Sequence, residues 1–114
     1  AEAESSLRRA IALGEQQLQV RPDDAVTLGL VALYHALLGE KEAALARVNQ
    51  AMTKSSVTGA AAAYCAMAYE LTGDRANAVR WAQKALDSGY AWKDLGTDVE
   101  MDQLVRSSAL RHSP

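Results

Sequence analysis

The 114-residue chain has no phenylalanine, only two prolines and a single cysteine, and each shortage narrows what it can be. Pro22 and Pro114 leave long stretches uninterrupted, which permits long helices because proline breaks a helix interior. Cys65 has no second cysteine with which to form an internal disulfide, and this favours a cytoplasmic localisation. No apolar run approaches the roughly 18 residues that span a bilayer, so we expect no membrane partner.

An excess of positive charge is also lacking. The chain carries 12 Lys and Arg against 14 Asp and Glu, for a net charge of −2, which argues against nucleic acid as a partner. What is present is a hydrophobic fraction of 49% that is rich in alanine. This fraction excludes a disordered chain, and alanine, the best helix former, favours closely packed helices over a sheet.

Residues of the same size class recur every 34 positions, which is typical of stacked helix pairs. The recurring sets include Ala10-Ile11, Ala44-Leu45 and Ala78-Val79, then Leu18, Met52 and Leu86, and the pair Gly39 and Gly73. Apolar spacing predicts helices over about residues 3–20, 25–38, 41–54, 59–72 and 75–88. Gly39 and Gly73 are expected to end the second and fourth of these, and Pro22 follows the first.

The spacing resembles the tetratricopeptide repeat family, whose pattern is W-x2-L-G-x2-Y, then A-x3-F, then P. The residues that carry the resemblance are Leu28, Val31, Ala32, His35, Ala44 and Val48, and then Ala62, Cys65, Ala66, Tyr69, Ala78 and Ala82. The chain departs from the pattern at its first bulky position, which is Leu28 or Ala62, and at the closing proline, which only Pro22 keeps. The resemblance implies an all-α, right-handed superhelical solenoid of antiparallel helix hairpins, with about five helices and a short C-terminal capping helix.

The same register divides the chain into four parts: residues 1–24 as the second helix of an incomplete repeat, residues 25–58 and 59–92 as repeats, and residues 93–114 as a loop and capping helix. The first helix lacks a preceding partner, so we expect the chain to be the end of a longer array. For the last part we predict a loop over residues 88–98 and a helix over residues 99–109, with Met101, Leu104, Val105 and Leu110 covering the open end of the stack.

The segment Asp98-Val99-Glu100-Met101, with Leu104, Arg106 and Leu110, resembles the closing segment of bacterial repeat-bearing signalling proteins. That resemblance implies an alternative function, in which the chain is the C-terminal regulatory tail of a serine/threonine kinase or a transcriptional regulator.

Few residues suggest chemistry. Cys65 and His35 are the one nucleophile–base pair, but both occupy packing positions of the repeat and no third residue orients the histidine. The alternating carboxylates of Asp94, Asp98, Glu100 and Asp102 lack the glycine and glutamate of a calcium loop, and Asp98 is expected to cap a helix instead. Trp81 and Trp92 are expected to be packing anchors. We therefore predict no enzyme activity, no metal and no cofactor.

The function predicted is binding of protein. In the resembled family, five positions of each first helix face a concave groove. These positions are Val26, Gly29, Leu33, Ala36 and Leu37 in one repeat and Ala60, Ala63, Met67, Glu70 and Leu71 in the next. The set is apolar and lacks the Lys, Asn and Arg that would clamp a peptide carboxylate. We expect the occupant to be an apolar peptide, an amphipathic helix or another domain of the parent chain, with a homodimer through the N-terminal helix as a further alternative.

Overall fold

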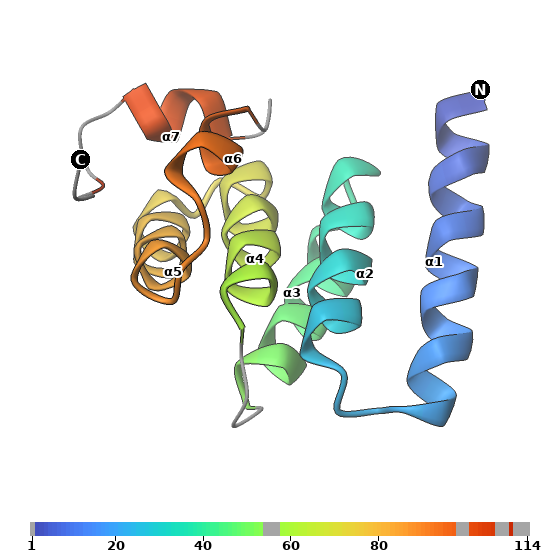
Figure 1. Ribbon diagram of the computed structural model, residues 1–114. Coiled ribbons are helices and arrows are strands. Elements are labelled where there is room, and N and C mark those ends of the chain that lie inside the picture. The colour runs from blue at the N-terminus through green and yellow to red at the C-terminus, as the bar shows by residue number, and fades with distance from the viewer. Residues whose placement is uncertain (1, 54–57, 98–100, 107–109, 111–114) are drawn as a thin grey trace.

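The computed structural model describes residues 2–53, 58–97, 101–106 and 110, and every element within these residues is an α-helix (Figure 1). The helices of these described residues are α1 (Glu2–Val20), α2 (Ala25–Leu37), α3 (Lys41–Met52), α4 (Gly59–Leu71), α5 (Arg75–Asp87), α6 (Trp92–Thr97) and α7 (Asp102–Arg106). None of these described helices is long and apolar enough to cross a membrane. The all-helical class that alanine content and spacing predicted is confirmed.

The two central helix pairs repeat one another at the 34-residue spacing of the sequence. Helix α2 spans residues 25–37 and α4 spans residues 59–71, while α3 and α5 begin at residues 41 and 75. Gly39 and Gly73 follow with φ of 78° and 89°, a left-handed conformation that glycine adopts without steric cost. After each glycine the chain closes the same turn: the amide of Glu40 donates to the carbonyl of His35, and the amide of Asp74 donates to that of Tyr69, both at 2.9 Å.

Side chains cap the helix starts at equivalent places. An oxygen of Asp24 accepts from the amide of Thr27 at 3.2 Å, the hydroxyl of Thr58 accepts from that of Ala61 at 3.2 Å, and Asp74 accepts from that of Asn77 at 3.1 Å. Each cap satisfies an amide that has no partner inside its helix. The local chemistry therefore fixes where α2, α4 and α5 begin.

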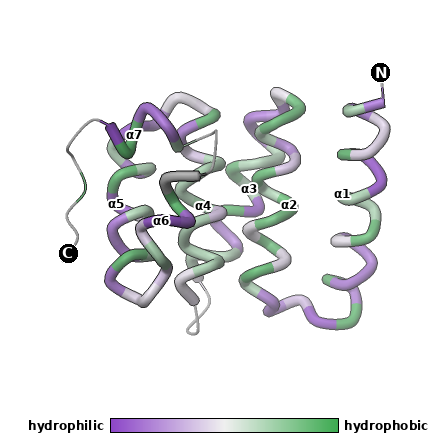
Figure 2. The backbone as a smooth tube through the Cα atoms, turned by 45° about the horizontal axis from the view of Figure 1, so that its top comes forward, coloured by the Kyte–Doolittle hydropathy of each residue, from purple (hydrophilic) through white to green (hydrophobic). Residues whose placement is uncertain are grey.

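Helices α2 and α4 form the centre of the molecule. Helix α2 packs against α1, α3 and α4, and α4 packs against α2 and α5. Figure 2 shows hydrophobic residues predominating along α2, whereas hydrophilic residues are interleaved along α1. Small residues permit the close approach of α2 and α4: a Cβ at Gly29 would lie 3.1 Å from the Cβ of Tyr64 and 3.2 Å from the carbonyl of Ala61. A side chain at position 29 would therefore push the two helices apart.

The C-terminal part differs from its prediction in one respect. Residues 88–98 were expected to form a loop, but α6 occupies Trp92–Thr97 within it. The physical reason lies in burial, because the Leu95 side chain is fully buried in the core. Of the helix predicted over residues 99–109, α7 accounts for Asp102–Arg106, and residues 99–100 and 107–109 lie outside the described part.

Several apolar side chains of the C-terminal part are buried, and the capping role expected for them stays a prediction. Helix α7 contacts α5, Met101 and Leu104 are fully buried and Leu110 is 8% exposed, while Val105 is partly buried against the core. In Figure 1 α6 and α7 lie beside α4 and α5, at the opposite end of the molecule from α1.

Candidate functional site

Half of the positions predicted to line a groove are buried. Gly29, Leu33, Ala36, Ala63 and Met67 all belong to the interior, with Leu33 only 8% and Met67 only 2% exposed. Four of them belong to the hydrophobic core, and the backbone of Gly29 lies close to α4. These five positions therefore have little surface to offer a partner, and a charged substitution at Leu33 or Met67 would act on folding first.

The other predicted positions remain accessible and lie at matching places on the two neighbouring helices. Val26 and Ala60 are half-buried in the first turns of α2 and α4, and Leu37 and Leu71 are 41% and 38% exposed at the last residues of the same helices. We call these four residues the apolar strip. Single exposed leucines are ordinary on protein surfaces, but two at equivalent register on packed helices form a repeated feature.

Glu70, the one charged residue among the predicted positions, lies beside the strip. Both of its carboxylate oxygens accept from the guanidinium of Arg75, at 2.8 Å and 2.6 Å. A bidentate pair of this kind holds both side chains in a fixed geometry. Glu70 therefore links the end of α4 to the start of α5, and its charge is already matched.

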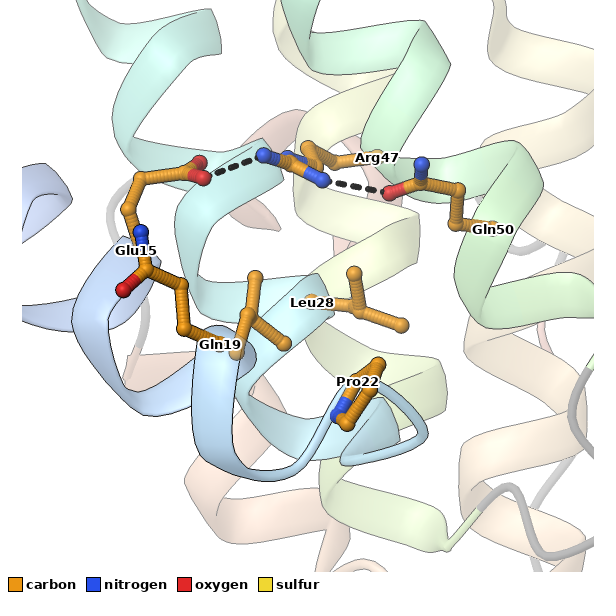
Figure 3. Close-up of a pocket in the computed structure, with 7 residues that line it drawn as sticks. Glu15, Gln19, Pro22, Leu28, Arg47 and Gln50 are labelled. Carbon is orange, nitrogen blue, oxygen red and sulfur yellow. Dashed lines mark hydrogen bonds and ion pairs between the residues drawn. The ribbon is translucent and has the colours of Figure 1, made fainter.

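A pocket of about 340 Å³ opens between α1 and α3 over the start of α2 (Figure 3). We call it the junction pocket. Its lining consists of Glu15, Leu18, Gln19, Pro22, Leu28, Arg47 and Gln50. Leu18 and Leu28 are 7% and 2% exposed and belong to the core, whereas Pro22 is exposed. The other lining residues are polar.

Arg47 joins the two sides of the junction pocket. Its guanidinium donates to the carboxylate of Glu15 on α1 and, at 2.7 Å, to the side-chain oxygen of Gln50 on its own helix (Figure 3). Neither the pocket nor a role for Arg47 and Gln50 was predicted from the sequence. The signal that would have indicated it is the 34-residue register, in which Arg47 stands where the next repeat has Trp81.

A second polar network links α1 to the turn after α2. Both carboxylate oxygens of Glu40 accept from Arg8, at 3.1 Å and 2.7 Å, and Nδ1 of His35 lies 2.8 Å from one of them. Hydrogen bonds from Arg8 and then His35 lower the pKa of Glu40 from 4.5 to about 2. The network fixes α1 against the next helix pair, and it engages the only histidine for which the sequence suggested a catalytic role.

Cys65 does not have the properties of a nucleophile. Its side chain is fully buried in α4, and desolvation raises the pKa of the thiol to about 12, which keeps it protonated at neutral pH. The Nδ1 atom of His35 makes a hydrogen bond with the carboxylate of Glu40. The burial of Cys65 supports its expected packing role, whereas His35 takes part in the polar network with Glu40.

The remaining candidates are carboxylates of the C-terminal part and two tryptophans. Among the described residues no group of three or more His, Cys, Asp or Glu is placed to hold a metal ion. Asp102 accepts from Arg106 at 3.1 Å, and Asp98 and Glu100, with the predicted capping role of Asp98, lie outside the described part. Trp81 is 5% exposed and Trp92 packs partly buried against the core, as expected of packing anchors.

No protein-family model, curated protein or solved structure matches this chain.

Proposed function

We propose that the chain is a non-catalytic protein-binding module whose helix pairs are stacked as in tetratricopeptide repeats. Three observations support this proposal. The bounds of α2 and α4 correspond at the 34-residue spacing, the starts of α3 and α5 correspond in the same way, and the glycine turns match. Helix pairs that repeat in this way form a rigid surface on which corresponding residues line up. The right-handed superhelical arrangement of the family is part of the proposal.

The surface that we propose for binding is the apolar strip. The observation that carries the proposal is the pair Leu37 and Leu71, which are 41% and 38% exposed at the ends of two packed helices. An amphipathic helix or an extended apolar peptide laid across α2 and α4 would remove both leucines from water, each worth about 1 kcal/mol for partial burial. In the alternative, in which the chain is the regulatory tail of a kinase or transcriptional regulator, a domain of the same parent protein would occupy this strip.

The test is a peptide-display selection on the immobilised chain, followed by affinity measurement with the Leu37→Glu/Leu71→Glu variant. We expect selected peptides to be rich in apolar residues and to lose at least about tenfold in affinity for the variant, because two charges would have to be desolvated. Leu13→Glu is the matched control, since Leu13 is 66% exposed on α1 and lies outside the strip. Failure to select any peptide, or equal binding by the variant, would refute the strip as the binding surface.

One observation favours a second candidate, self-association through α1. Leu13 and Val20 are 66% and 81% exposed and stand seven residues apart, which places them on one face of the helix. Sedimentation velocity of the chain and of the Leu13→Glu/Val20→Glu variant distinguishes a dimer from a monomer. A dimer that dissociates in the double variant supports self-association, and a monomer at every concentration excludes it.

A further inference from the structure

The junction pocket shares no residue with the apolar strip or with the exposed pair Leu13 and Val20 of α1. Its floor is apolar, from Leu18 and Leu28, and Glu15, Gln19, Arg47 and Gln50 supply its polar lining. A volume of about 340 Å³ lies at the lower end of the range for ligand pockets. A pocket of this size suits one ring system or one large side chain.

The equivalent positions of the next helix pair indicate what kind of side chain fits the junction pocket. Adding 34 residues to Arg47, Gln50 and Leu18 gives Trp81, Lys84 and Met52. At that later junction the indole of Trp81 is 5% exposed within the core, and the ammonium of Lys84 lies 5.0 Å from the centre of the ring. The second helix pair therefore carries its own indole, with a cation over it, where the first pair carries a guanidinium beside an open pocket.

The charges of the junction pocket favour a neutral occupant. Arg47 is compensated by Glu15 and further held by Gln50, so no charge is left unmatched for an ionic ligand. Arg stacks on aromatic rings as well as forming ion pairs, so a compensated guanidinium can still contact a neutral ring. Among the lining residues, the side-chain oxygens of Glu15, Gln19 and Gln50 are acceptors for an N–H group at the edge of such a ring.

We propose that the junction pocket binds an indole ring, presented as the tryptophan side chain of a partner polypeptide. In a polypeptide that side chain carries no charged groups of its own, which matches the compensated Arg47–Glu15 pair, whereas a free amino acid would bring an unmatched ammonium and carboxylate. The inference is independent of the apolar strip, because the two surfaces share no residue.

The probe is N-acetyl-tryptophanamide, a neutral tryptophan with both ends blocked, titrated into the isotope-labelled chain and followed by amide NMR shifts. We expect saturable shifts centred on Leu18, Leu28, Arg47 and Gln50, with zwitterionic tryptophan binding more weakly. Shifts confined to other helices, or no saturation, would overturn the proposal. Shifts produced by free indole but not by N-acetyl-tryptophanamide would also overturn it, because the pocket would then take a small molecule and not a side chain.

Two substitutions at one position sharpen the test. Arg47→Trp supplies the indole that the second junction has and should abolish probe binding, whereas Glu42→Trp, at an exposed position in the first turn of α3, should leave it intact. Arg47→Ala, which needs no repacking, should weaken binding about threefold or more through loss of the stacked cation. Unchanged affinity in Arg47→Ala or Arg47→Trp would contradict the assignment. Normal binding by Leu37→Glu/Leu71→Glu would show that this result does not depend on the strip.

Discussion

Gly14 is the position at which helix propensity and packing make opposite predictions about stability. It lies in the interior of α1, and a Cβ built there would be 2.5 Å from Cγ2 of Val31, which is fully buried on α2. Replacing a helical glycine by alanine ordinarily stabilises a helix by about 1 kcal/mol. Packing an extra methyl against a β-branched side chain, whose rotamer cannot easily change, costs about 1–3 kcal/mol.

We therefore expect Gly14→Ala to lower the free energy of unfolding by about 1 kcal/mol, taking about 2 kcal/mol for overpacking against about 1 kcal/mol gained in propensity. Val31→Ala alone should cost about 2 kcal/mol for lost burial and the cavity left behind. In the double variant the clash is removed and the propensity gain is kept, so the loss should be about 1 kcal/mol where the sum of the singles is about 3 kcal/mol.

Urea denaturation followed by far-UV circular dichroism measures all three values. Ala12→Gly, at an exposed position of the same helix, measures the propensity contribution separately and should cost about 1 kcal/mol. If Gly14→Ala raised stability, or if the two substitutions were additive, the close contact between α1 and α2 would be refuted.

Three further outcomes follow from individual side chains. Because the pKa of the Cys65 thiol is raised to about 12, an aromatic disulfide reagent should label it only at the rate of unfolding, and labelling of the native chain at the rate of a free thiol would contradict its burial. Because the folded pKa of Glu40 is about 2 against an ordinary 4.5, its contribution to stability is present above pH 4.5 and is lost as the pH falls towards 2. Glu40→Gln should therefore lose less stability than the parent over that range in acid titration of unfolding, and identical profiles would argue against the Arg8–Glu40 contact. Thr58→Ala should cost about 1 kcal/mol by removing the cap of α4, whereas Thr58→Ser should keep it, and equal losses in both would exclude a capping role.

The helix pairs were predictable because their signals are local. Alanine-rich periodic stretches, a glycine after each first helix and capping side chains before α2 and α4 determine the bounds without reference to the rest of the chain. Helix α6 was missed because six residues are too few to show a helical period. Its formation depends on burying Leu95 in the hydrophobic core, and a local sequence pattern does not report such burial.

The candidate surfaces were less predictable, because exposure depends on neighbours. Leu33 and Leu37 stand one helical turn apart in α2, yet one is 8% and the other 41% exposed. The difference arises from what packs on each turn, which the sequence of α2 does not contain. The junction pocket likewise depends on a non-local comparison, since Arg47 looks like a surface residue until it is set beside the buried Trp81.

In the stacked arrangement that we propose, the corresponding starts of the helices in the two pairs make the chain divisible into exchangeable blocks. Residues 41–74 run from the start of α3 to the cap of α5, and both ends of this block lie just before a helix that follows a glycine turn. A second copy inserted after Asp74 would meet the same local backbone at each joint, so duplication in a gene could lengthen the molecule by one pair without disturbing its ends. After such a duplication, a substitution at the position equivalent to 47 and 81 would decide whether the new junction is filled, as at Trp81, or open, as at Arg47.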